Sequence, residues 1–134
     1  SGQRFMNESA SYVDCGHWQY ERNKEVPAIP AYMIADARHR KYYLYGTMFP
    51  GITPKEVYQS GMMVKADSIP ELARACGIDP QNLVETVRRF NQFAASGKDL
   101  DFHRGDSAYD RVYSDPKVKP NPNLGSIEKP PFFV

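Results

Sequence analysis

The sequence predicts an α+β fold in which a small mixed or antiparallel sheet packs against helices. Three observations predict this class. Two short apolar segments, residues 32–35 and 62–66, have the length and composition of strands. Two segments with helical start and stop signals, residues 68–77 and 79–97, follow them, and a proline-rich segment, residues 115–131, comes last. The 134 residues are enough for one compact domain with a hydrophobic core.

The chain begins with a polar segment, residues 3–9, which predicts an extended lead-in. Residues 11–22 have a weak helical periodicity, marked by Tyr12 and Tyr20. Pro27 and Pro30 then make residues 26–30 a stiff extended connector, because each proline fixes its own φ and restricts the residue before it.

A strand, a helical turn and a short helix are predicted in the next thirty or so residues. Residues 32–35 are apolar and lie between Pro30 and Asp36, which favours a short buried strand. Residues 36–43 form a helical turn rich in basic side chains. The sequence Thr53-Pro54 opens a short helix that ends near Gly61, directly before the second strand.

Residues 68–77 have clear signals for a helix. Ser68 and Glu71 stand at capping-box spacing, and Gly77 closes the segment. One face of this helix carries Ile69, Leu72, Ala73 and Cys76.

The strongest helical pattern in the chain is residues 79–97. Asp79 is a good N-cap, and Pro80 fits the first helical position, where a missing N–H costs nothing. Gly97 can take the left-handed conformation that ends a helix. An apolar stripe of Leu83, Val87 and Phe90 requires cover from other segments. With the preceding helix it forms an expected αα-hairpin.

The remainder of the chain lacks clear periodicity. Residues 98–114 are irregular, and the five prolines of residues 115–131 indicate a segment ordered by packing rather than by its own hydrogen bonds. Phe132-Phe133-Val134 predicts a strand, which we expect to continue beyond the given sequence.

Composition excludes several classes of function. The formal net charge is +1 with acidic and basic residues interspersed, which argues against a nucleic-acid partner and against a polybasic membrane patch. No apolar run is long enough for a transmembrane segment, and no signal-peptide pattern opens the chain. Cys15 and Cys76 are far apart, so we expect reduced, buried thiols in a cytoplasmic protein, with a disulfide as the alternative.

Motifs for metals and nucleotides are absent from the sequence. It contains no GxGxxG fingerprint, P-loop, HExxH pair or cysteine cluster, so we expect no metal site. His17, His39 and His103 are widely separated and favour surface or capping roles. Asp99, Asp101 and Asp106 lack the closing glutamate of a calcium loop and are predicted to be solvated loop carboxylates.

Tyrosines cluster at Tyr42-Tyr43-Leu44-Tyr45, next to several basic residues. A phenol has a reference pKa of about 10, and a nearby cation such as Arg38, Arg40 or Lys41 would lower that pKa. Taken alone, the cluster favours half-buried packing.

Several ordered stretches together carry a resemblance to a known superfamily. They are GQRFMNES (2–9), Asp36 with Arg40-Lys41-Tyr42-Tyr43, PGITP (50–54), KADSIPELA (65–73), GIDP (77–80), TVRRFN (86–91), GKDLDF (97–102), Pro120-Asn121-Pro122, Leu124-Gly125 and Pro130-Pro131-Phe132. Together they resemble the capping (catalytic) domain of the fumarate reductase/succinate dehydrogenase flavoproteins, and within it the 3-ketosteroid dehydrogenases.

This resemblance implies that residues 1–134 are an insertion domain of a larger flavoprotein, excised from it. The implied cofactor is FAD, held mainly by a Rossmann-like domain outside this chain that carries the missing glycine fingerprint. The implied partners are that domain and a steroid-like small molecule, which would suit an apolar, aromatic wall. The excised lobe is expected to be inactive by itself.

The family's reaction, as the resemblance implies it, removes two hydrogens across a carbon–carbon bond next to a ketone. One leaves as a hydride to flavin N5 and the other as a proton to a tyrosine of the capping lobe. The pattern places this tyrosine at Tyr43, with Tyr42 and Tyr45 as fallbacks, although the family usually has a basic residue where this chain has Tyr42. Asn7 and Glu8 correspond to a pair near the flavin, with a structural role as the first reading and cofactor contact as the second.

Two alternatives remain at this stage. Fumarate-type members use an arginine acid and histidines that hold a dicarboxylate, for which Arg40 and His39 are the candidates. A stand-alone, non-catalytic binding domain with a tyrosine-rich partner surface is the other.

Overall fold

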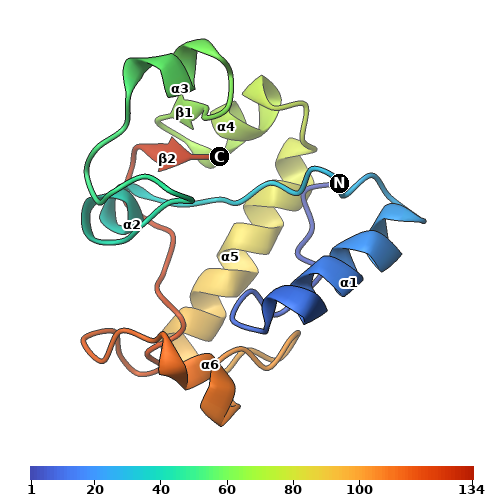
Figure 1. The fold of residues 1–134 in the computed structure, drawn as a ribbon, viewed down its shortest axis with the longest axis vertical. Coiled ribbons are helices and arrows are strands. Elements are labelled where there is room, and N and C mark those ends of the chain that lie inside the picture. Colours follow the sequence, from blue (N-terminus) through green and yellow to red (C-terminus); the bar gives the residue numbers. More distant parts are fainter. The chain divides into compact units, whose positions relative to one another are not determined.

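The computed structural model describes residues 1–134 and contains six helices and one two-stranded antiparallel sheet (Figure 1). The predicted α+β class is confirmed. The chain divides into two compact units. The first unit comprises Ser1, Gln3–Ala31 and Glu85–Ser126, and the second comprises Gly2, Tyr32–Val84 and Ile127–Val134. No helix is both long and apolar enough to cross a membrane.

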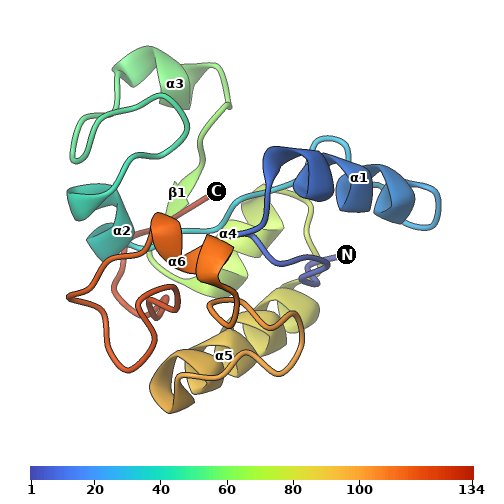
Figure 2. The same cartoon turned by 60° about the horizontal axis from the view of Figure 1, so that its bottom comes forward.

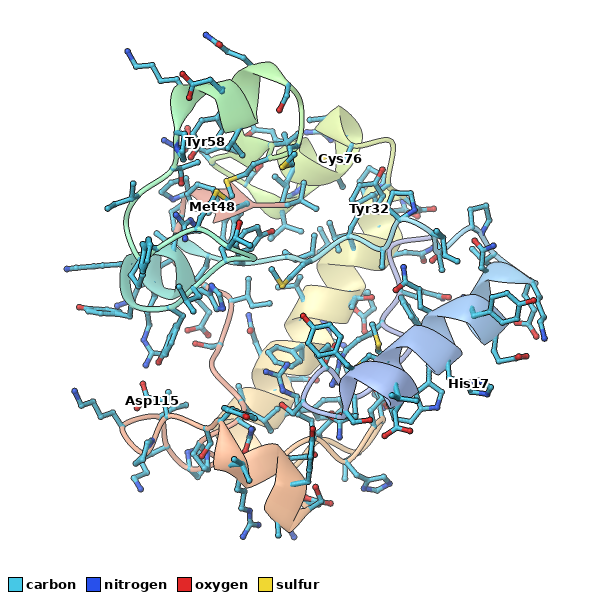
Figure 3. All side chains as sticks on the ribbon, viewed as in Figure 1. His17, Tyr32, Met48, Tyr58, Cys76 and Asp115 are labelled. Atoms are coloured by element: carbon cyan, nitrogen blue, oxygen red, sulfur yellow. The ribbon has the colours of Figure 1, made fainter.

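Helix α1, Tyr12–Asn23, belongs to the first unit and confirms the predicted helix at this place. The Ser11 side chain begins it by accepting a hydrogen bond from the Asp14 N–H. None of its residues is buried, and Tyr12 is 98% exposed. His17 projects from this helix in Figure 3.

Helix α5, Pro80–Ser96, is the 17-residue helix predicted from its caps. The Asp79 carboxylate accepts from the Asn82 N–H at 2.9 Å, and Gly97 takes φ 78° just after the last turn. The stripe of Leu83, Val87 and Phe90 is buried. Pro80–Val84 belong to the second unit and the remainder of the helix to the first.

The segment after α5 is largely irregular, as expected, but it contains one helix that the sequence analysis missed. Helix α6, Ala108–Val112, begins where the Ser107 side chain accepts from the Asp110 N–H. The proline-rich segment buries Val118 and Leu124, as predicted, but it also forms hydrogen bonds of its own, which the prediction excluded. The Asp115 N–H donates to the Pro122 carbonyl at 3.1 Å, and the Leu124 N–H donates to the Asn121 carbonyl at 3.0 Å. Cys15 and Cys76 are free thiols, as predicted, but each is only partly buried.

The second unit contains the sheet. Strand β1, Lys65–Ala66, pairs antiparallel with β2, Phe132–Phe133, with Lys65 opposite Phe133. Helix α4, Ile69–Ala75, packs against both strands and begins at the predicted Ser68 cap. It buries Ile69, Leu72 and Ala73.

The strand predicted over residues 32–35 is wrong. Only Ala35 pairs, in a single bridge to Phe133, with hydrogen bonds of 2.9 and 2.8 Å. Tyr32 and Met33 are exposed, so this segment reaches the apolar interior at Ala35 and runs over the surface before it. The strand predicted over residues 62–66 is shortened to Lys65–Ala66.

The core of the second unit is small and partly aromatic. Ala35, Tyr45, Met63 and Phe133 are buried together, and Met48 packs against them (Figure 3). Helices α2, Ala37–Tyr42, and α3, Lys55–Gln59, confirm the predicted helical turn and short helix. A long loop connects them (Figure 2).

Candidate active site

Helix α2 is anchored at its start by one buried carboxylate. Asp36 is 2% exposed, and its Oδ1 accepts from the His39 N–H at 2.9 Å. Its Oδ2 accepts from the N–H groups of Glu128 and Lys129 at 3.2 and 3.1 Å. The Ala37 N–H also donates to the Lys129 carbonyl at 2.9 Å. The start of α2 is therefore fixed to the segment that leads into β2.

The middle of α2 is anchored by a buried cation. Arg40 is 4% exposed, and its Nη2 donates to Ile52 O at 3.0 Å and to Thr53 Oγ1 at 2.8 Å. The Arg40 carbonyl accepts from the Gly51 N–H at 2.6 Å. Gly51 has φ 72°, a conformation that side chains disfavour. Arg40 therefore ties the loop after α2 back to the helix.

Tyr43 ends this anchored helix. Its N–H donates to the His39 carbonyl at 2.9 Å, and its backbone then turns extended, with φ −123° and ψ 159°. The side chain is half-buried, and its ring centroid lies 5.3 Å from that of His39. The structure thus places Tyr43, the principal candidate from the sequence, at the end of an anchored helix, where the residue is half-buried.

Tyr42 and Tyr45 lie in contrasting surroundings. Tyr42 is 59% exposed, with the Lys41 ammonium 5.2 Å from its ring centroid. Tyr45 is 7% exposed and its hydroxyl donates to the Met33 carbonyl.

Burial raises the pKa of Tyr45 to about 12, although Arg40 acts to lower it. The cation therefore acts on the pKa of Tyr45 in the expected direction, but desolvation outweighs it and the net shift is upward.

An open cleft of about 330 Å³ lies beside α2 in the second unit. It has cationic, aromatic and small side chains around it. Its lining residues are Ala37, Arg40, Lys41, Gly51, Thr53, Tyr58 and Phe133. Tyr58, one of the lining residues, lies on α3 (Figure 3).

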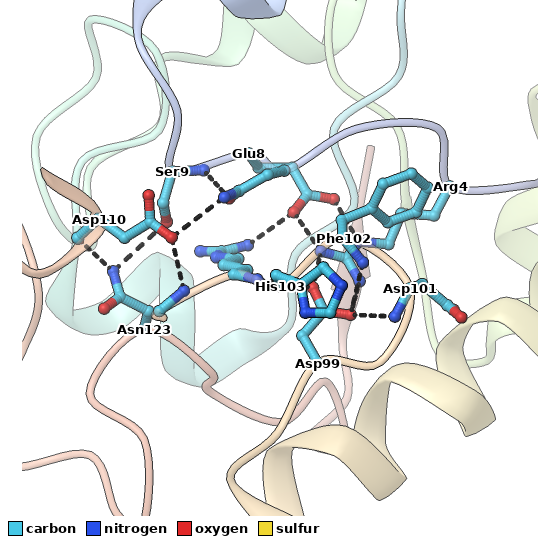
Figure 4. Close-up of polar contacts among 12 residues, drawn as sticks. Arg4, Glu8, Ser9, Asp99, Asp101, Phe102, His103, Asp110 and Asn123 are labelled. Atoms are coloured by element: carbon cyan, nitrogen blue, oxygen red, sulfur yellow. Dashed lines mark hydrogen bonds and ion pairs between the residues drawn. The ribbon is translucent and has the colours of Figure 1, made fainter. Parts of the chain in front are cut away.

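Asn7 and Glu8 belong to the first unit, and both form hydrogen bonds there. Figure 4 shows the contacts around Glu8. Asn7 Nδ2 donates to Asp110 Oδ2 at 3.0 Å, while Asn7 Oδ1 accepts from the Ser9 N–H at 2.9 Å. Glu8 accepts from Arg4 Nε at 2.6 Å and from Arg104 Nη1 at 3.2 Å. These contacts are those expected of the structural reading, and contact of Asn7 and Glu8 with the cofactor stays a prediction.

Arg4 is the centre of this network. It donates to Asp99 Oδ1 and Oδ2 at 3.0 and 2.7 Å, and its guanidinium lies 5.1 and 5.0 Å from the ring centroids of Phe90 and Phe102. Burial acts to lower the pKa of Arg4, but hydrogen bonds to Glu8 and Asp99 outweigh it and raise the pKa. Burial likewise opposes ionisation of Asp99, yet Arg4 holds the pKa of that carboxyl below its ordinary value.

The predicted solvation of the loop carboxylates is therefore wrong for Asp99, whose side chain is fully buried. Its oxygens also accept from the N–H groups of Asp101, Phe102 and Arg104. Asp101 Oδ1 lies 2.6 Å from Arg89 Nη2, and Asp106 Oδ2 lies 3.3 Å from His103 Nδ1.

The chain has neither the glycine fingerprint of a dinucleotide cradle nor a group of side chains that could hold a metal ion. A phosphate cradle needs a glycine-rich turn that leads into a helix N-terminus. Gly77 and Gly97 instead follow the ends of α4 and α5, and the Ser107 side chain occupies the first turn of α6. No group of three or more histidine, cysteine, aspartate or glutamate side chains could hold a metal ion.

Comparison with known proteins gives the family. The FAD binding domain family matches residues 1–133. The chain belongs to this flavoprotein family. It is 46% identical over 139 residues to a 3-oxosteroid 1-dehydrogenase of Mycobacterium tuberculosis, covering 99% of this chain and 25% of that relative.

One solved structure agrees with this membership, and a second shares the fold. A crystal structure of 3-ketosteroid delta1-dehydrogenase from Sterolibacterium denitrificans, in complex with 1,4-androstadiene-3,17-dione, has a TM-score of 0.93 and 36% identity over 98% of this chain and 24% of that chain. The open conformation of a flavocytochrome c3 fumarate reductase shares the fold, with a TM-score of 0.65 and 21% identity over 98% of this chain and 18% of that one. The superfamily resemblance is confirmed. The chain spans about a quarter of the length of the steroid dehydrogenases it matches.

Proposed function

We propose that residues 1–134 form the substrate-capping lobe of an FAD-dependent 3-ketosteroid dehydrogenase, which introduces a C=C bond next to a ketone. The similarity to 3-oxosteroid 1-dehydrogenases over almost the whole chain supports this substrate class. The observation that carries the site is the position of Tyr43 at the end of α2, a helix fixed at its start by Asp36 and in its middle by Arg40. In this proposal, FAD is held mainly by a part of the protein outside residues 1–134. A cytoplasmic location stays a prediction.

In this proposal Tyr43, as the phenolate, accepts the proton that leaves the carbon next to the ketone and thereby becomes the neutral phenol. A phenol has a reference pKa of about 10, so it serves as a base only when it is oriented on an activated carbon acid. Bound FAD would supply the acceptor for the hydride. The contribution of this chain is to hold the phenol oxygen in place.

The environments of the other tyrosines support the choice of Tyr43. The Tyr45 hydroxyl is buried against the Met33 carbonyl, and burial raises its pKa to about 12, so it suits packing better than proton transfer. Tyr42 is exposed, with Lys41 over its ring.

The surroundings of Arg40 argue against a fumarate-type role for this chain. An arginine that acts as a general acid needs an N–H directed at the substrate. Here Nη2 is engaged by Ile52 O and Thr53 Oγ1, and Nη1 is buried without a hydrogen-bond partner. The residue is only 4% exposed, so its guanidinium is enclosed by its own unit.

The test uses the full-length protein loaded with FAD, an androstenedione-type substrate and a dye acceptor. Tyr43→Phe should lower kcat by a hundredfold or more, roughly the value of a general base, with little change in KM. Tyr42→Phe and Tyr45→Phe test the fallback positions, and Tyr113→Phe, at a 90% exposed residue, is the matched control. Normal turnover by Tyr43→Phe would remove the role assigned here, and fumarate reduction without steroid turnover would replace the substrate class.

A further inference from the structure

The imidazole of His39 lies between two tyrosine rings. Its centroid is 5.3 Å from that of Tyr43, with the planes tilted by 46°, and 6.0 Å from that of Tyr45, with the planes at 82°. Both separations fall within the range in which aromatic pairs attract each other. The Arg40 guanidinium carbon lies 5.7 Å from the Tyr45 centroid. Arg40, Tyr45, His39 and Tyr43 therefore form a row of four contacting side chains, with Tyr43 at its outer end.

The inner end of this row is fixed. Arg40 and Tyr45 are both buried, and the Arg40 Nη2 is bound by Ile52 O and Thr53 Oγ1. The Tyr45 hydroxyl is held by the Met33 carbonyl, which restrains its ring against rotation out of the row. The side of His39 that faces Tyr45 therefore contacts a surface that does not move easily.

The backbone of His39 is also held on both sides. Its N–H donates to Asp36 Oδ1 at 2.9 Å, and its carbonyl accepts from the Tyr43 N–H at 2.9 Å. Tyr43 directly follows the last residue of α2, and the 5.3 Å centroid separation places the His39 ring against the Tyr43 ring. The imidazole therefore sits where it can limit the rotation of the Tyr43 ring.

We propose that His39 is a positioning residue for Tyr43, whose ring packing holds the phenol in the orientation from which it accepts the proton of the substrate. This inference rests on the proposed function. It assigns His39 a packing role, so a flat apolar ring of similar size should replace it. A small error in the placement of a reacting group can lower the rate of the chemical step without weakening substrate binding. Removal of the His39 ring should therefore lower kcat and leave KM nearly unchanged.

The experiment is a double-mutant cycle in the full-length protein loaded with FAD. His39→Ala should lower kcat about three- to tenfold, the size expected from the loss of one aromatic pair, and leave KM within about twofold. His39→Phe should keep kcat within about twofold of the parent protein. In the Tyr43→Phe background, His39→Ala should cause no further loss, because the group it positions has gone.

His17→Ala, at an exposed histidine of α1, is the matched control and should leave turnover unchanged. If His39→Ala does not fold, His39→Leu keeps volume without a ring and should show the same loss of kcat. An unchanged kcat in His39→Ala, an equal further loss in the Tyr43→Phe background, or a loss in His39→Phe as large as in His39→Ala would each overturn the inference. Normal turnover by Tyr43→Phe would instead remove the proposed function, so the two failures are distinguishable.

Discussion

The two units hold their buried charges in different ways. In the first unit the buried Asp99 is paired with a cation, Arg4, which also binds Glu8, while the buried Asp110 accepts from Asn7 and from the Gly105 N–H. In the second unit the buried charges bind the backbone and a hydroxyl instead, since Asp36 accepts from three N–H groups and Arg40 donates to a carbonyl and to Thr53. Charge pairs make the first unit sensitive to the loss of one partner and to pH. Backbone hydrogen bonds and ring contacts make α2 a support for Tyr43, the base in the function proposed above.

The largest effect should follow removal of the cation from the first unit. Arg4→Met leaves Asp99 buried without its partner, which should cost about 3 kcal/mol or more in the free energy of local opening. Hydrogen exchange of residues 99–104 in the full-length protein measures it. Arg88→Met, which removes an exposed ion pair with Glu85, is the matched control and should leave this exchange unchanged. Equal protection in Arg4→Met and the parent would contradict the pairing.

Removal of the cation from the second unit should cost less. Arg40→Met leaves Ile52 O and Thr53 Oγ1 without their donor, but it leaves no buried charge of opposite sign without a partner. We therefore expect a loss of about 1–3 kcal/mol in the free energy of local opening. The hydrogen exchange of residues 49–53 reports this change. A loss larger than that in Arg4→Met would break the contrast between the units.

Acid should loosen the first unit. The pKa values of Asp99 and Asp110 are lowered in the folded state, where hydrogen bonds from Arg4 and Asn7 outweigh burial. Their contribution to stability is therefore complete above the ordinary carboxyl pKa of about 3.9 and is lost as pH falls below it, through the lower folded values.

Amide protection measured between about pH 6 and about pH 2 tests this acid response. It should fall for Arg104, whose N–H donates to Asp99. Asp99→Asn, which cannot titrate, should flatten the pH dependence at this amide. An Arg104 amide with the same protection at both ends of the range would argue against an ionised Asp99.

The smallest effects should come from helix caps, and they should be equal in the two units. Ser107 caps α6 in the first unit and Ser68 caps α4 in the second, each accepting from the N–H three residues later. Serine to alanine at either position should cost about 1 kcal/mol in local opening of its helix. Because the hydrogen bond of a helix cap is a local interaction, the two variants should lose similar free energies of local opening. A large difference between them would mean that the surrounding packing determines this loss.

Local signals predicted most of the helices. Asp79, Pro80 and Gly97 gave α5 its bounds almost to the residue, and Ser68 marked the start of α4. Helix α6 was missed, although Ser107 and Asp110 stand at the same cap spacing and could have indicated it. The contact of His39 with Tyr43 is also local, at four residues apart on a predicted helix, and could have been found from that spacing.

Long-range partners could not be predicted from the same signals. The sequence around Asp99 predicts a solvated loop carboxylate, because its partner Arg4 lies 95 residues away and gives no local signal. The pairing of Ala35 with Phe133 depends equally on the tertiary fold, so an apolar run at residues 32–35 was not enough to make a strand. The assignment of Tyr43 came from the family resemblance, and its role as a base stays a prediction.

The most direct test of that role follows the proton itself. The full-length protein, loaded with FAD, is incubated with a 3-ketosteroid in D₂O, and deuterium entering the carbon next to the ketone is measured by NMR or mass spectrometry. The parent protein should exchange this position, and Tyr43→Phe should do so at least about a hundredfold more slowly. Exchange at the parent rate in Tyr43→Phe would contradict the account.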